Sequence, residues 1–172
     1  SNKMMTLREM QDLIKNRKII QNRAVQIALL SNITLAPYFD PVLKIAFAKS
    51  NFTVHVQSVQ YEEYEANQEI FKSANLIIIL LNFATMFPNY LQHITLEQIE
   101  SQLDCACEEL YTYLKHTGTC PVFWFSFEDF EDNIPYILGN LYHGFTDKIN
   151  HHLSHILDEP DVLVDTKRLI AE

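Results

Sequence analysis

The chain has 172 residues, 48% of them hydrophobic, which is enough to bury one sizeable core. Its net charge of −9 at pH 7 argues against a surface that binds nucleic acid or anionic membranes by electrostatic attraction. No apolar run approaches the roughly 20 residues of a membrane span, and the N-terminal residues show no signal-peptide pattern, so we expect a cytoplasmic protein.

Glycine is scarce, and the three glycines come late in the chain, at Gly118, Gly139 and Gly144. The chain therefore lacks the glycine-rich loops that cradle phosphates or bind dinucleotides. We expect no cofactor.

Cysteine is scarce too, and Cys105, Cys107 and Cys120 are too few for a disulfide framework. Cys105 and Cys107 are two residues apart on a predicted helix, so their side chains point away from each other. Buried thiols explain the cysteines better than a metal or redox site.

The first elements of the chain are predicted by capping residues and hydrophobic spacing. A capping-box pattern, Thr6 to Glu9, precedes apolar residues at helical spacing and predicts a helix over 7–18. A short apolar run predicts a buried strand over 24–30. Asp40-Pro41 offers an N-cap and a proline at the first helical position, so a helix should follow.

The middle of the chain is predicted to alternate between strands and helices. Residues 52–59 alternate as a strand, and the polar residues 61–71 follow as a helix or loop. The unbroken aliphatic run over 74–82 predicts a strand buried on both faces, which is typical of the centre of a parallel sheet. Thr95 and Gln98 predict the start of a long helix that ends near Gly118.

The C-terminal part adds a strand over 120–128, a long helix from Ile134-Pro135 to about Leu157, a strand over 161–165 and a last helix from Thr166. Strands that alternate with long helices predict an α/β fold with three layers around a doubly wound, parallel, five-stranded sheet in the flavodoxin-like order. We expect one α/β domain over 21–172 behind a helical extension over 1–20.

The residues after the first strand, Leu30-Ser31-Asn32-Ile33-Thr34, resemble the first block of the SGNH hydrolases, Gly-Asp-Ser-Ile-Thr, whose Ser is the nucleophile. Asn32 takes the place of that nucleophile here. By the same resemblance, Asn82 in Leu-Leu-Asn-Phe stands where an oxyanion donor would be. No glycine precedes Gly118 to supply the second block, and no Asp-x-x-His pattern occurs. The resemblance implies an SGNH-like domain that has lost its nucleophile.

Residues 25–71, 74–83, 149–156 and 162–172 resemble the N-terminal SGNH-like domain of FkbH-like proteins, which belong to subfamily IIIC of the haloacid dehalogenase superfamily. This resemblance implies a C-terminal phosphatase-like domain and an acyl carrier protein as partners. It also implies a place in the biosynthesis of natural products or surface polysaccharides, through acyl loading. The Asp-x-Asp-x-Thr signature of the phosphatase-like domain is absent, so the chain would be a fragment or a stand-alone version.

Polar residues close the predicted parallel strands, and these ends meet at the edge of the sheet where open α/β folds bind ligands. The candidate ligand-binding residues are Ser31, Asn32, Thr34, Asn82 and Ser126. The alternative for Ser31 and Asn32 is that they bond loop backbone or cap the next helix. Ser31 is also the weak candidate for a catalytic nucleophile, and it would need a base within hydrogen-bond reach.

Three histidines, His151, His152 and His155, have helical spacing that suggests a metal site. No carboxylate or cysteine in the same turns completes it, so we expect solvent-facing histidines and no metal.

The sequence leaves three functions open. The favoured one is a non-catalytic recognition or docking domain of an FkbH-like protein. The first alternative is an SGNH-type esterase or acyl hydrolase that uses Ser31. The second is a dimerisation module, which predicts a large apolar patch on an exposed helix.

Overall fold

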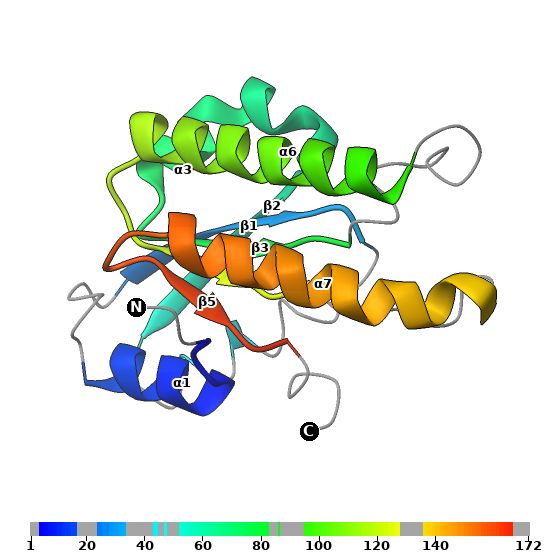
Figure 1. The fold of residues 1–172 in the computed structure, drawn as a ribbon. Helices are drawn as coiled ribbons and strands as arrows, with labels where there is room; N and C mark the ends of the chain where they lie inside the picture. Colours follow the sequence, from blue (N-terminus) through cyan, green and yellow to red (C-terminus); the bar gives the residue numbers. More distant parts are fainter. Residues whose placement is uncertain are drawn as a thin grey trace.

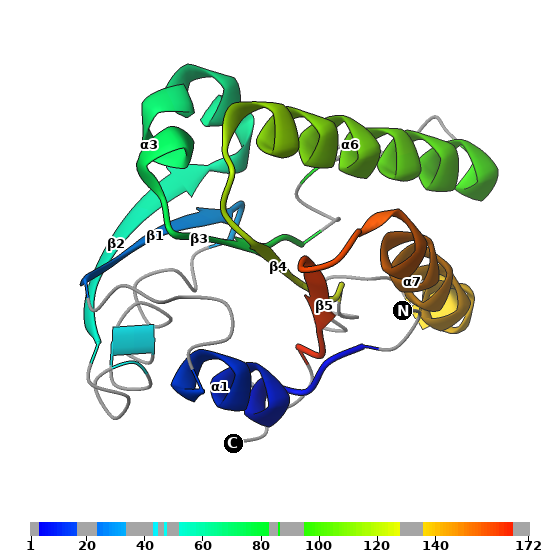
Figure 2. The same ribbon diagram turned by 90° about the vertical axis from the view of Figure 1, so that its left-hand side faces the viewer.

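The computed structural model describes residues 4–16, 24–33, 43–44, 47, 52–82, 86, 95–127 and 136–166, with the backbone alone at residues 96 and 136–145. Five parallel strands form one sheet (Figure 1), in the order β2-β1-β3-β4-β5, which runs from left to right in Figure 2. The strands are β1 (Ala24–Ser31), β2 (Thr53–Gln60), β3 (Leu76–Leu80), β4 (Val122–Phe125) and β5 (Val162–Val164). This order is the flavodoxin-like one, as the sequence predicted.

Helices cover both faces of the sheet. The helices are α1 (Leu7–Lys15), the 3-10 helix η1 (Tyr61–Asn67), α3 (Gln68–Ser73), α6 (Leu96–Thr117) and α7 (Tyr136–Ile156). Figure 2 shows α3, α6 and α7 on one side of the sheet and α1 on the other. The fold is therefore a three-layer α/β domain, as predicted. In the described part of the chain, no helix has the length and hydropathy to cross a bilayer.

The aliphatic run of β3 is buried on both faces, which explains why it has no polar residue. Ile77 and Ile79 belong to the core under α6 and α7, whereas Ile78 and Leu80 belong to the core under α1. Successive side chains of a strand point to opposite faces, so a strand between two helical layers must be apolar throughout. The prediction of a central strand is confirmed, although β3 is shorter than the predicted run of 74–82.

The predicted helix starts are confirmed at two capping residues. The Thr6 hydroxyl accepts a hydrogen bond from the Glu9 backbone at 3.1 Å. At the start of α6, the Gln98 N–H donates to Thr95 Oγ1 at 3.2 Å, and the Thr95 N–H donates to Gln98 Oε1 at 2.8 Å. These bonds satisfy backbone donors that have no partner within the helix.

Gly118 ends α6, but not by the left-handed turn that a terminal glycine usually provides. Its φ of −113° and ψ of 169° are extended angles open to any residue. A Cβ at this position would lie 3.0 Å from the carbonyl oxygen of Phe71 in α3. Glycine is therefore suited to this site because α3 approaches the chain closely.

The N-terminal segment is joined to the sheet. The Met5 N–H donates to the Leu163 carbonyl at 2.7 Å, and the Asp165 N–H donates to the Met5 carbonyl at 2.7 Å. Met10 and Ile14 of α1 are buried in the core under the sheet. The segment before β1 thus contributes to the core and covers the β5 edge.

Other predictions fall on parts of the chain that are only partly described. Of the helix predicted from Asp40-Pro41, the structure describes Leu43, Lys44 and Phe47, which are helical. The helix predicted from Thr166 lies outside the described residues beyond that position. Among side chains that the structure does describe, Met4 is the one exposed large hydrophobic residue. The described helix faces therefore do not show the apolar patch that was expected of a dimerisation module.

Candidate functional site

The predicted site residues lie along the carboxyl edge of the sheet. Ser31, the last residue of β1, is aligned with Gln60 of β2 on one side and with Leu80 of β3 on the other. The chain continues from β1 to β2 on one flank and from β3 to β4 and β5 on the other, so the topological switch point lies between β1 and β3. Asn32 and Asn82, which follow these two strands, therefore meet at this point.

Asn32 and Asn82 are joined by a reciprocal pair of hydrogen bonds. The Asn32 amide nitrogen donates to the Asn82 carbonyl oxygen at 2.7 Å. The Asn82 backbone N–H donates to Asn32 Oδ1 at 2.7 Å. Both ends of the Asn32 amide thus bind backbone groups, which is the structural role that the sequence left open for this residue. The bonds tie the ends of β1 and β3 together at the switch point.

Ser31 is fully buried, and its hydroxyl has no hydrogen-bond partner in the described structure. Strand alternation places its side chain on the same face as Ile27 and Leu29, in the apolar core under α1. A serine nucleophile needs a base that removes its proton, and none contacts Ser31 in the described structure. Leaving a buried polar group without a partner costs about 1–3 kcal/mol.

Ser126 joins the ends of β4 and β5 through hydrogen bonds with Thr166. The Thr166 N–H donates to Ser126 Oγ at 3.0 Å, and the Thr166 hydroxyl donates to the Ser126 carbonyl at 2.6 Å. Both residues are buried. The polar groups of Ser126 are thus used within the fold. The fifth candidate, Thr34, lies outside the described residues.

The histidines of α7 differ in their surroundings. His151 and His155 are exposed, as predicted, and their ring centroids are 4.4 Å apart. His152 is only partly exposed, and the expectation of a solvent-facing side chain is wrong for it. Its Nε2 lies 3.0 Å from Glu108 Oε1 and 4.0 Å from Asp104 Oδ1. The shorter contact lacks the alignment of a hydrogen bond.

The carboxylates near His152 come from α6. The sequence of α7 alone therefore does not indicate them. Burial, and to a smaller degree Glu100 and Glu108, raise the pKa of Asp104, while His152 opposes that rise. Within the described ranges, no three His, Cys, Asp or Glu side chains are arranged to hold a metal ion.

The cysteines divide into two buried thiols and one exposed thiol. Cys107 and Cys120 are buried, as predicted, whereas Cys105 is exposed on α6. Burial raises the pKa of the Cys120 thiol to about 11. A thiol that stays protonated at neutral pH is a poor nucleophile, so Cys120 is a packing residue.

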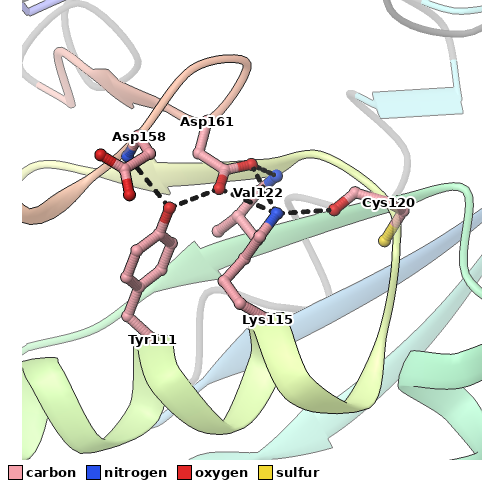
Figure 3. A network of polar contacts seen from close by, with 6 residues as sticks. All are labelled: Tyr111, Lys115, Cys120, Val122, Asp158 and Asp161. Atoms are coloured by element: carbon pink, nitrogen blue, oxygen red, sulfur yellow. Dashed lines mark hydrogen bonds and ion pairs between the residues drawn. The ribbon is translucent and has the colours of Figure 1, made fainter.

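A polar cluster that the sequence did not reveal lies at the opposite, amino-terminal edge of the sheet (Figure 3). Asp161 is its centre, with a side chain only 1% exposed. Its carboxylate accepts a hydrogen bond from the Tyr111 hydroxyl at 2.6 Å and from the Val122 N–H at 2.7 Å. The Lys115 ammonium lies 2.9 Å from the same carboxylate.

The Tyr111 hydroxyl also accepts a hydrogen bond from the Asp158 N–H at 3.0 Å. Burial, followed by the bond to Asp161, raises the pKa of Tyr111. Because the hydrogen bonds and the ion pair drawn in Figure 3 link α6 with the chain at the starts of β4 and β5, the cluster anchors α6 to these strands. No spacing in the sequence links residues that come from three separate elements.

Two shallow grooves flank α6. One, of about 520 Å³, is lined by acidic side chains and His152. The other, of about 580 Å³, includes Tyr64 and Tyr113, whose ring centroids are 5.1 Å apart. Residues of α6 line both grooves.

The comparisons with known proteins agree with the fold. No family model and no curated protein matches the chain. Among solved structures, it is similar to the N-terminal part of the protein BF1531 from Bacteroides fragilis, which contains a phosphatase domain and is complexed with Mg. The TM-score is 0.64 at 13% sequence identity, and the match covers 94% of this chain but 46% of that chain. This chain thus spans about half the length of the structure it matches, and the two share an α/β fold.

Proposed function

We propose that this chain is a recognition or docking domain without catalytic activity of its own, related to the SGNH-like domains of FkbH-like proteins. The observation that carries the proposal is the Asn32 side chain. It stands at the position of the SGNH nucleophile, and the Asn82 backbone holds it through two hydrogen bonds of 2.7 Å.

The chemistry of this position supports a loss of hydrolysis. The lone pair of an amide nitrogen is delocalised, so Asn32 cannot attack an ester. Ser31 next to it carries a hydroxyl, but that hydroxyl is buried in the described structure and has no base beside it.

The comparison with BF1531 supports the proposed setting. That structure contains a phosphatase domain, and this chain matches about half of it. A domain that works beside a phosphatase-like domain would present a substrate or a carrier to the neighbouring active site. We propose an acyl carrier protein as that carrier and a biosynthetic acyl-loading step as the setting.

The net charge of the chain bears on how it could bind an acyl carrier protein. Acyl carrier proteins are usually acidic, and this chain carries a net charge of −9. Electrostatic steering therefore does not favour the encounter. Docking would rely on apolar and hydrogen-bonding contacts at the carboxyl edge of the sheet. Because salt screens the repulsion between two acidic proteins, the affinity should rise with salt concentration.

Two measurements on the purified chain test the proposal. The first follows hydrolysis of p-nitrophenyl acetate by the wild type and by Ser31→Ala, and we expect no serine-dependent turnover. The second titrates the chain with a holo acyl carrier protein, with its apo form as the control, and we expect saturable binding. Turnover that disappears in Ser31→Ala would establish the esterase instead. Absence of binding would overturn the docking role.

A further inference from the structure

The two edge strands of the sheet, β5 and β2, differ in whether another segment covers them. The outer edge of β5 is covered, because Met5 forms two backbone hydrogen bonds with residues at its end. The other edge is β2, an eight-residue strand that pairs with β1 along its full length. No other segment in the described part of the chain forms backbone hydrogen bonds with β2.

The side chains of β2 are also poorly covered. Of its residues, Val59 is buried, and Val54 and Val56 are partly buried. The others are exposed: Thr53, His55, Gln57, Ser58 and Gln60. Every second residue of a parallel edge strand points its N–H and C=O away from the sheet, so this edge offers a row of backbone donors and acceptors.

The usual protection of an edge strand is missing from β2. Natural edge strands are short, bulged, or carry lysine, proline or an inward-pointing charge. β2 is as long as the central strand β1, and its register with β1 is one-to-one over all eight residues, so it has no bulge. Thr53–Gln60 contains no proline and no Asp, Glu, Lys or Arg. Such an edge is suited to pairing with another strand.

We propose that β2 pairs antiparallel with β2 of a second copy of this chain, so that two five-stranded sheets join into one continuous sheet. The charge of the molecule restricts where a second copy can bind. Two chains of net charge −9 repel each other, and a contact between them must avoid opposing carboxylates. β2 offers a full strand that contains no Asp, Glu, Lys or Arg.

Symmetry fixes which residues face each other. In an antiparallel pair related by a two-fold axis perpendicular to the sheet, residues that face each other lie on the same face of the sheet. With the axis at Val56, the half-buried Val56 lies opposite the partner's Val56. His55 then lies opposite the partner's Gln57, and this contact occurs twice.

The test measures the mass of the full chain by sedimentation velocity across a concentration series. We expect the wild type to reach twice the 20.1 kDa of one chain. The double variant His55→Lys, Gln57→Lys places lysines opposite each other at both symmetric contacts. We expect the dissociation constant of the dimer to rise by about tenfold or more, because like charges directly across a strand pair repel.

A matched double variant, Gln11→Lys with Gln102→Lys, makes the same change in net charge at exposed positions on α1 and α6. Its dissociation constant should stay close to that of the wild type. Circular dichroism and thermal melting check that both variants fold. Hydrogen exchange supplies a second readout, because the outward amides of β2 should gain protection as the wild-type concentration rises.

Three outcomes would overturn the proposal. The first is a wild type that stays at the mass of one chain at about 100 µM, a concentration at which micromolar dimers are populated. This result would leave the edge to an extended segment of another protein. The second is a dimer of unchanged affinity in the β2 double variant, and the third is a dimer whose β2 amides exchange as in the monomer. None of these results bears on hydrolysis or carrier binding, so the docking proposal is tested separately.

Discussion

The Asn32 side chain binds the backbone of Asn82 through two hydrogen bonds, which we call the clamp. The clamp joins the ends of β1 and β3, the two strands on either side of the topological switch point. The amide oxygen accepts one bond and the amide nitrogen donates the other, each at 2.7 Å. The clamp therefore gives Asn32 a structural role at the end of β1.

Replacement of Asn32 by alanine should destabilise the protein by about 2 kcal/mol, because it leaves the N–H and the C=O of Asn82 without these partners. Urea unfolding followed by circular dichroism measures the loss. Asn67→Ala is the control, because the Asn67 amide makes a local and exposed bond to the Glu63 carbonyl. A cost for Asn32→Ala no larger than that of the control would show that the clamp contributes little.

Ser31 and Ser126 form a matched pair of buried serines at the same edge of the sheet. The Ser31 hydroxyl has no partner in the described structure, whereas Ser126 Oγ accepts a bond from the Thr166 N–H. Ser31→Ala should change the free energy of unfolding by less than about 0.5 kcal/mol or increase it, since no hydrogen bond is lost. Ser126→Ala should lower the free energy of unfolding by about 1–2 kcal/mol, since it leaves the buried Thr166 N–H without its acceptor. Equal costs for the two variants would contradict the difference in their bonding.

The order of the strands could be predicted because local patterns and packing agree. The strand β3 itself, Leu76–Leu80, has no polar residue, and a strand between two helical layers permits none. The capping residues Thr6 and Thr95 marked helix starts because a cap involves neighbours within three residues. The position of Ser31 and Asn32 at the strand end followed from the same short apolar run.

Contacts between distant segments could not be predicted in this way. Asn32 and Asn82 are 50 residues apart, and the sequence placed them at one edge without showing that one amide binds the other's backbone. The acidic partners of His152 come from another helix. The role of Gly118 depends on the position of Phe71 in space. In each case, tertiary packing determines the partner, and the sequence pattern around the residue does not indicate it.

The Asp161 cluster should contribute strongly to stability. Asp161→Ala removes the acceptor for three donors and leaves the Lys115 ammonium without its carboxylate, so we expect a cost of about 3–5 kcal/mol. Tyr111→Phe removes one bond to Asp161 and one from Asp158, and it should cost about 1–3 kcal/mol. Because the two residues share a bond, the double variant should cost less than the sum of the single variants. Additive costs in urea unfolding would show that the cluster does not act as a unit.

Asp104 should make a small and pH-dependent contribution to stability. Its pKa lies above the ordinary value of 3.8, chiefly because burial disfavours the charged form, although His152 works in the opposite direction. The folded protein therefore binds this proton more tightly than the unfolded chain does. The resulting stability is fully present below pH 3.8 and is lost as the pH rises through the raised pKa.

Asp104→Asn removes this dependence, so the variant should melt at a slightly higher temperature than the wild type at pH 7. The gain should disappear below pH 3.8, where the wild-type carboxyl is protonated in both states. Glu97→Gln on the same helix is the control, because Glu97 lines the same groove and is exposed. It also removes one negative charge, and thus separates the effect of net charge from that of burial. A lower melting temperature for Asp104→Asn at pH 7 would show instead that the contact with His152 outweighs the cost of burying the carboxylate.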